Sequence, residues 1–235
     1  MSRRLLAEFL GSALLAAVVI GSGIAAQQLS QDTGLQLLEN SVATAFGLFA
    51  LILMFGPVSG AHFNPVVSLV DAAFGGLPWR TAAFYVPAQI AGCIFGAVIA
   101  NAMFELPAVS ISETDRTSAA HLLSEVIATA GLTVMIFSLV RSGRAAMAAA
   151  AVGAYIGAAY WFTSSTSFAN PAITVGRVFS DTFAGIAPAS VLPFILAQLV
   201  GGGLAFALVR FLYPGLGPAE AKDVVVPVAV ERSTR

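Results

Sequence analysis

Two Asn-Pro dipeptides are the residues whose types and surroundings best fit a chemical role in this chain. They are Asn64-Pro65 and Asn170-Pro171, and each is followed by a short apolar stretch. Proline is favoured at the first position of a helix, because the N–H that it lacks would have no helical partner there. Asparagine is a preferred N-cap, since its side-chain oxygen accepts a hydrogen bond from a free N–H of the first turn. Both dipeptides therefore predict helix starts, and each asparagine keeps an NH2 group that can donate to a ligand.

Two glutamates, Glu8 and Glu125, lie inside long apolar runs. Carboxylates within membrane spans usually mark function, and a proton-coupled secondary transporter would use them as proton carriers. We favour a structural role, in which each carboxylate accepts hydrogen bonds from backbone N–H groups of a segment without regular structure. The proton-coupled transporter is kept as the alternative.

The elements that must position these residues are apolar runs of membrane-spanning length. The chain has 235 residues, of which 58% are hydrophobic and only 10% are charged. Soluble domains carry about 25% charged residues, so this composition excludes an ordinary soluble protein and a disordered chain. Helices that cross a hydrocarbon core need roughly 20 apolar residues. Six runs meet this requirement: Leu5–Ala26, Leu37–Phe55, Ala82–Phe104, Leu122–Val140, Ala145–Phe162 and Ala189–Tyr213.

Other kinds of chemistry find little support in the sequence. The formal net charge of −1 gives no indication of a nucleic-acid partner. The two histidines have no clustered Cys, Asp or Glu beside them, so we expect no metal site. We find none of the short motifs of hydrolases, metalloproteases or phosphate-binding loops. We therefore expect neither an enzyme nor a cofactor.

The distribution of basic residues predicts the orientation in the membrane. Cytoplasmic loops carry an excess of Lys and Arg, and six spans place both termini on the same side. That side would hold Arg3, Arg4, Arg80, Arg141, Arg144, Arg210, Lys222, Arg232 and Arg235, whereas the other side would hold only Arg116 and Arg177. We expect a multi-pass protein of the plasma membrane with both termini in the cytoplasm.

Three blocks of sequence recur in the same order in the two halves of the chain. The blocks are A-E-F-L-G-S-A-L-L with S-E-V-I-A-T-A-G-L, G-A-H-F-N-P-V-V-S with S-F-A-N-P-A-I-T, and A-Q-I-A-G-C-I-F-G-A with A-Q-L-V-G-G-G-L-A-F-A. Each half holds three spans, so the second half enters the membrane from the opposite side and the repeat is inverted. We expect a first repeat over residues 1–117, a second over 118–213 and a cytoplasmic tail over 214–235.

Each half also contains a segment too short to cross the membrane, Gly56–Gly76 and Thr163–Ala187. Short apolar pieces interrupted by proline at matching places in inverted halves point to a functional site. The fold class that follows is an all-α membrane protein with six transmembrane helices and two re-entrant half-helices. Where the half-helices meet, amide donors and positive helix ends would favour a small neutral solute and oppose protons and cations.

These features resemble the aquaporin superfamily, the major intrinsic proteins. The resemblance is carried by S-G-A-H-F-N-P-V at residues 59–66, N-P-A at residues 170–172, the two span glutamates and the six-span length. It implies a passive channel for water and small uncharged solutes, embedded in the lipid bilayer, with a pore in every protomer of a homotetramer. The midplane of that pore would be formed by Asn64, Pro65, Val66, Asn170, Pro171 and Ala172.

The sequence departs from the family pattern at two positions. Val66 replaces the usual alanine of the first box, and Ile173 replaces the arginine that usually follows the second box and forms the outer selectivity filter. A filter without that arginine implies a wider pore that passes glycerol-type polyols, and in some bacterial members uncharged metalloid hydroxides such as arsenite. The other filter positions would be Ser167, either Thr44 or Phe46 in the second span, and either Ala158 or Tyr160 in the fifth.

Two further residues are candidates for the pore mouths. Arg177 lies four residues after Ile173, on the same helical face, and helical side chains lean toward the N-terminus. Its guanidinium either reaches back to replace the missing arginine, or points to the interface or pairs with Asp181. His62 either lines the inner mouth or is a packing residue.

Overall fold

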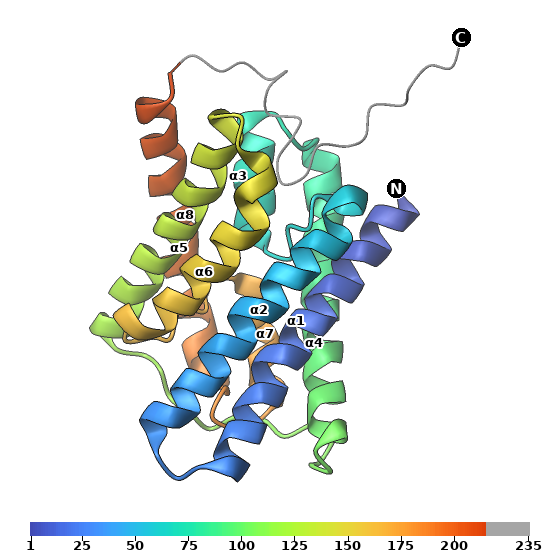
Figure 1. Cartoon of the computed structure of the whole chain (residues 1–235), viewed down its shortest axis with the longest axis vertical. Coiled ribbons are helices and arrows are strands. Elements are labelled where there is room, and N and C mark those ends of the chain that lie inside the picture. The colour runs from blue at the N-terminus through green and yellow to red at the C-terminus, as the bar shows by residue number, and fades with distance from the viewer. Residues whose placement is uncertain (215–235) are drawn as a thin grey trace.

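The computed structural model describes residues 1–214, and every regular element within that part is a helix (Figure 1). Apart from residue 214, the expected cytoplasmic tail lies outside the described residues. Six helices are long and apolar enough to cross a membrane, which confirms the six predicted spans. They are α1 (Ser2–Leu29), α2 (Thr33–Ser59), α4 (Trp79–Met103), α5 (Ala119–Arg141), α6 (Ala148–Phe162), which continues from the 3-10 turn η1 (Ala145–Met147), and α8 (Pro188–Leu212).

Two short helices begin at the predicted Asn-Pro positions. Helix α3 covers Pro65–Phe74, and α7 covers Pro171–Gly176 and continues into the 3-10 turn η2 (Arg177–Phe179). The side-chain oxygen of Asn64 accepts a hydrogen bond from the N–H of Val66, and that of Asn170 accepts from two N–H groups in the first turn of α7. Both asparagines are therefore N-caps, as the sequence indicated.

The two halves of the chain run in opposite directions through the bundle. In Figure 1, α1 starts in the upper part of the molecule and runs down, whereas α5 starts in the lower part and runs up. In the first half α1 packs against α2 and α4, and in the second half α5 packs in the same way against α6 and α8. Each half-helix also contacts the other half, because α3 packs against α8 and α7 packs against α4. The halves thus interlock around the half-helices.

Glycines let the paired long helices approach closely. Gly92 and Gly96 of α4 face the backbone oxygens of Phe9 and Ala13 in α1, at distances that leave no space for a Cβ atom. In the second half, a Cβ on Gly201 of α8 would lie 2.5 Å from the backbone oxygen of Val126 in α5. Small residues at helix contacts are typical of membrane bundles, in which backbone proximity replaces the hydrophobic driving force of water.

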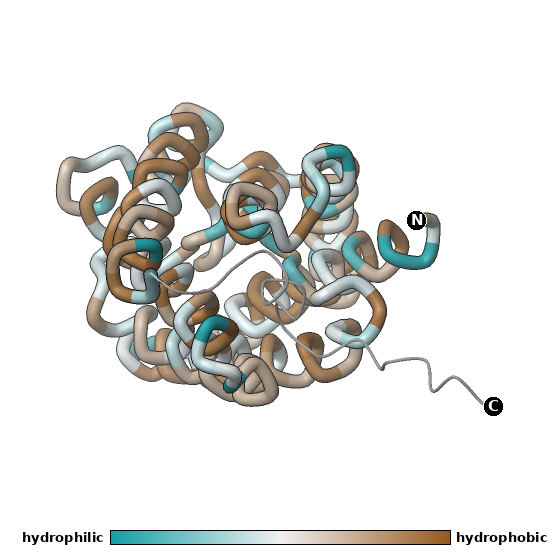
Figure 2. Tube along the Cα trace, turned by 90° about the horizontal axis from the view of Figure 1, so that it is seen from above, coloured by the Kyte–Doolittle hydropathy of each residue, from teal (hydrophilic) through white to brown (hydrophobic). Residues whose placement is uncertain are grey.

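The outer surface of the bundle suits a lipid environment. Large apolar side chains are exposed along the long helices, for example Leu199, Leu204 and Phe211 of α8. Seen from above, the chain trace is brown or white over most of its length, and teal is limited to short stretches (Figure 2). Inside the bundle, a group of buried polar side chains lies at the half-helices and the segments leading into them, among them Ser59, His62, Asn64, Ser167 and Asn170.

Replacement of Gly96 by alanine is expected to destabilise the fold. The added Cβ would collide with the backbone oxygen of Ala13, so α4 must move away from α1, at a cost of about 1–3 kcal/mol for overpacking. Gly203→Ala is the matched control, since a Cβ added at Gly203 would meet nothing within 4 Å. The measurement is the melting temperature of each purified variant in detergent, obtained from the amount of folded protein that gel filtration recovers after heating. Equal melting temperatures for the two variants would contradict the tight α1–α4 contact.

Candidate functional site

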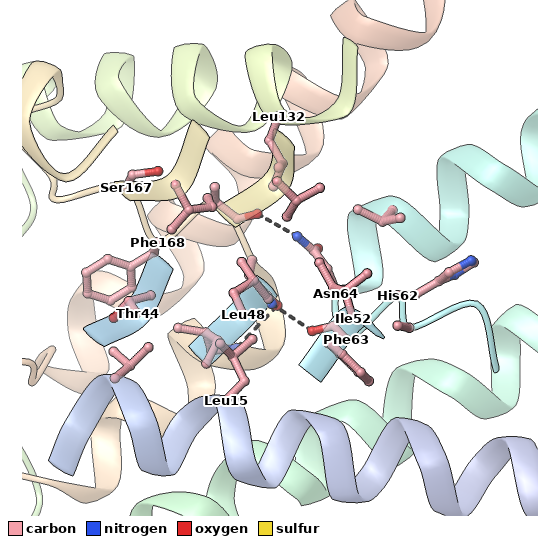
Figure 3. A pocket seen from close by; sticks show the side chains of 18 of the residues that line it. Leu15, Thr44, Leu48, Ile52, His62, Phe63, Asn64, Leu132, Ser167 and Phe168 are labelled. Carbon is pink, nitrogen blue, oxygen red and sulfur yellow. Dashed lines mark hydrogen bonds between the residues drawn. The ribbon is translucent and has the colours of Figure 1, made fainter. Parts of the chain in front are cut away.

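A narrow cavity of about 60 Å³ lies between the two half-helices and the long helices (Figure 3). About 10–15 Å³ of such volume suffices for one water molecule, so the cavity is large enough to hold water. One side of its wall is apolar and comes from α1, α2, α5 and α6, with the side chains of Leu15, Val19, Leu48, Ile52, Leu132, Ile136, Val152 and Ile156. The other side is formed by the segments that lead into α3 and α7.

The two N-cap asparagines meet at the middle of this cavity. The amide nitrogen of Asn64 donates a hydrogen bond to the backbone oxygen of Ala169 (2.7 Å), and that of Asn170 donates to the backbone oxygen of Phe63 (2.7 Å). These bonds are drawn as dashed lines in Figure 3. The sequence suggested that each whole NH2 group is spare. In the structure one N–H of each amide ties the two loops together, which leaves the other N–H for a solute.

Glu8 is fully buried and accepts four hydrogen bonds. Its donors are the backbone N–H groups of His62 (3.1 Å) and Phe63 (2.8 Å), the hydroxyl of Ser59 (2.6 Å) and the amide of Gln89 (2.7 Å). A carboxylate offers about four acceptor positions. All of them are in use, and two hold the loop that precedes α3.

Glu125 repeats this arrangement in the second half. It is also fully buried, and it accepts from the backbone N–H groups of Phe168 and Ala169 (both 2.9 Å), the hydroxyl of Ser165 (2.6 Å) and the amide of Gln198 (2.6 Å). With every acceptor position of both carboxylates in use, the structure gives no support to a proton-coupled transporter that carries protons on Glu8 and Glu125.

The loops that the two glutamates hold have an unusual backbone. Ala61 and Phe63 have φ values of 50° and 48°, and the matching residues Ser167 and Ala169 have values of 52° and 46°. The left-handed region is unfavourable for residues other than glycine, and it costs on the order of 1–3 kcal/mol for each residue. The hydrogen bonds to Glu8 and Glu125 hold this strained backbone in place.

The end of the cavity near α7 carries most of the polar side chains. The hydroxyls of Thr44 and Tyr160 lie 3.1 Å apart, and both residues line the cavity. Ser167 also lines it, and its buried hydroxyl has no partner among residues 1–214. Arg177 lines the cavity as well, and its side chain is buried. It forms no ion pair with Asp181 within the described part of the chain.

Two of the alternative filter residues are placed elsewhere. Phe46 is 70% exposed and Ala158 is also exposed, so both lie on the outer surface of the bundle. Two residues correspond to about 200° around a helix, and a helix that directs Thr44 or Tyr160 into the cavity must therefore direct its neighbour two positions away outward. Phe46 and Ala158 were wrong as filter alternatives.

Of the residues expected at the midplane, some line the cavity and others do not. Asn64 and Asn170 line the cavity, whereas Pro65, Pro171 and Ala172 are buried next to it in the first turns of the half-helices. Val66, which we also expected at the midplane, does not line the cavity, because its side chain packs on Gly202 of α8. The positions that do face the cavity come one residue later, at Val67 and Ile173.

His62 lines the end of the cavity near α3 and is also packed tightly. Its Nδ1 lies 3.0 Å from the hydroxyl of Ser68, and its Nε2 lies 3.5 Å from a carboxylate oxygen of Asp71. The ring also makes an edge contact with Tyr85. Both expectations for this residue, lining the cavity and packing, therefore describe it.

Sequence reasoning missed several residues of the site. Gln89 and Gln198 are the second residues of the third repeated block, and their recurrence in that block was a usable signal for a shared role. Phe168, Asp71 and Arg116 carried no such signal, because their contacts depend on how loops from distant parts of the chain fold together.

A cavity with an apolar wall and two asparagines at its middle, between two half-helices inside a bundle of six membrane-spanning helices, defines a membrane channel. The family model described as Major intrinsic protein matches residues 1–167. The chain belongs to the major intrinsic protein family, the aquaporins and their relatives.

The chain is similar over most of its length to individual members of that family. It is 49% identical over 212 residues to the aquaglyceroporin AqpS of Rhizobium meliloti, covering 90% of this chain and 91% of the relative. It is 29% identical over 262 residues to the glycerol uptake facilitator protein of Pseudomonas aeruginosa, covering 92% of each. The X-ray structure of the aquaglyceroporin from Plasmodium falciparum aligns with a TM-score of 0.71 at 19% identity, over 92% of this chain and 96% of that one, and shows the same fold.

Replacement of either buried glutamate by glutamine is expected to destabilise the protein. All four partners of each carboxylate are donors, so an NH2 group in place of one oxygen leaves donors without an acceptor, at about 1–3 kcal/mol each. Glu8→Gln and Glu125→Gln should both melt earlier than the parent protein. The exposed Glu113→Gln is the control. Parent-like melting of both buried variants would mean that these bonds do not hold the loops.

Proposed function

We propose that this protein is a passive channel for water and small uncharged solutes of the glycerol type. The observation that carries the proposal is the cavity itself, in which hydrogen-bonding side chains such as those of Asn64, Asn170 and Tyr160 line a mainly apolar wall. Such a pore lets a hydroxyl group exchange hydrogen bonds with successive donors, while the carbon side of a polyol slides along the apolar wall. Two of the relatives, an aquaglyceroporin and a glycerol uptake facilitator, support the same solute class.

The residues we assign to the pore fall into three groups. Asn64 and Asn170 offer donors at the midplane, with Val67 and Ile173 beside them. Thr44, Tyr160 and Ser167 form the narrow polar end near α7, and His62 lies at the other end. Glu8 and Glu125 position both loops. Because Ile173 is apolar, uncharged metalloid hydroxides such as arsenite belong to the same set of candidate solutes.

The cellular arrangement is also a proposal. The connections between spans that would lie on the same side of the membrane as the termini carry most of the basic residues. This excess supports a plasma-membrane protein with both termini in the cytoplasm. Membership of the family supports a homotetramer with one pore in each protomer.

Stopped-flow light scattering of proteoliposomes tests the proposed function. Water and glycerol should cross rapidly, with a low activation energy and no dependence on a proton gradient. Flux that saturates and disappears with the proton gradient would contradict a passive channel, as would permeability no higher than that of empty liposomes.

Replacement of Ile173 by tryptophan is expected to block the pore. The larger side chain would occupy a cavity of only about 60 Å³, so water and glycerol permeability should both fall to nearly the level of empty liposomes. Leu204→Trp is the control, because Leu204 is 55% exposed on the outer surface of α8. Equal permeability of the two variants would show that solutes do not pass Ile173.

A further inference from the structure

We propose that Arg177 is the selectivity-determining cation of this pore, and that Arg116 is a positioning residue that holds it in place. This inference rests on the proposed channel function. It concerns the narrow polar end of the cavity near α7, where sequence position 173, directly after the second Asn-Pro-Ala box, carries no charge.

The Arg177 side chain is placed where a solute must pass it. The residue is 2% exposed and lines the cavity together with Thr44, Tyr160 and Ser167. No carboxylate forms an ion pair with it within residues 1–214. A buried charge inside a membrane is costly unless it faces a paired group or a water-filled cavity. The cavity is therefore the polar environment of this guanidinium.

The guanidinium is fixed by two contacts that leave part of it free. Its Nε donates a hydrogen bond to the backbone oxygen of Ala184, and its central carbon lies 3.4 Å from the centre of the Phe168 ring. No hydrogen bond joins its two terminal nitrogens to another of the described residues. These N–H groups are the donors that Arg177 has left for a solute at this end, where the buried hydroxyl of Ser167 also has no partner among the described residues.

Arg116 contacts the same turn and the same ring as Arg177. It comes from the segment between α4 and α5, and it donates from Nε to the backbone oxygen of Gly185 (2.8 Å) and from Nη2 to that of Phe183 (3.1 Å). Its central carbon lies 5.1 Å from the centre of the Phe168 ring. Three successive backbone oxygens, those of residues 183–185, thus accept hydrogen bonds from two arginines.

The position of Arg116 is itself fixed. Its backbone N–H donates to the hydroxyl of Ser190 in α8 (3.0 Å), and that hydroxyl donates to Asp115 (2.8 Å). The segment that joins the two halves of the chain is therefore anchored to α8 beside the pore. Loss of the Arg116 side chain removes two of the hydrogen bonds that hold the turn at 183–185, and the middle oxygen of this turn is the one that holds Arg177.

Permeability ratios of proteoliposomes test both roles. Glycerol, the five-carbon polyol ribitol and sodium ions are compared with water for the parent protein, Arg177→Ala, Arg116→Ala and the double variant. Arg177→Ala should raise the ribitol-to-water ratio about tenfold, as expected for loss of a charged hydrogen-bond donor, and should increase sodium leak. Arg116→Ala should give a smaller change in the same direction. The control variant Arg144→Ala removes an exposed arginine that is distant in sequence from both Arg116 and Arg177. Its permeability ratios should match those of the parent protein.

The double variant shows whether Arg116 acts by positioning Arg177 or acts on solutes independently of it. Because Arg116 acts through Arg177, the double variant should equal Arg177→Ala, whereas multiplied effects would overturn the role of Arg116. An unchanged ribitol ratio and sodium leak in Arg177→Ala would overturn the role of Arg177. If gel filtration shows that this variant does not fold, Arg177→Gln and Arg177→Lys take its place, and only lysine should keep sodium out. A parent protein that conducts neither water nor glycerol would instead refute the proposed function.

Discussion

The structure depends on one kind of interaction, the hydrogen bonds from backbone N–H groups of two re-entrant loops to buried carboxylates. At membrane depth no solvent is available to an irregular backbone, so its polar groups must find partners inside the protein. Glu8 and Glu125 accept from two consecutive N–H groups each, next to residues held at positive φ. Without these acceptors neither loop could keep its asparagine at the midplane.

The glycine contacts follow from the same constraint. A side chain of α4 can reach the carboxylate in α1 only if α1 and α4 lie close, and Gly92 and Gly96 permit that approach. Gln89 of α4 then donates to Glu8, as Gln198 of α8 donates to Glu125. The helix contacts and the loop hydrogen bonds thus form one structure in each half. The side chain of Val66 fits into it because Gly202 leaves the space on α8.

The sequence predicted the fold well and the site in part. The six spans, the two half-helix starts and the inverted order of elements follow from apolar length, Asn-Pro chemistry and the repeat, all of which are local signals. The filter could not be derived in the same way, because the difference between Thr44 and Phe46 is one of helix rotation, which apolar runs do not fix. Similarly, Val67 rather than Val66 faces the cavity because of the direction in which α3 enters. The contacts of Arg116 with residues 183–185 join segments about 70 residues apart, and no local pattern encodes them.

The two ends of the cavity show how one repeat can give a pore with different ends. Arg177 lies seven residues after its asparagine and contacts Phe168, which lies two residues before it. The equivalent positions of the first half are Asp71 and His62, and they too are in contact. The inverted repeat therefore places the same pair of positions at each end of the pore, a cation on a ring at one end and a carboxylate beside an imidazole at the other. The midplane must stay symmetric because its two asparagines bond to each other's loops. These end pairs make no such reciprocal bonds, so their side chains can differ without disturbing the loops, and the chemical difference between the two ends resides there.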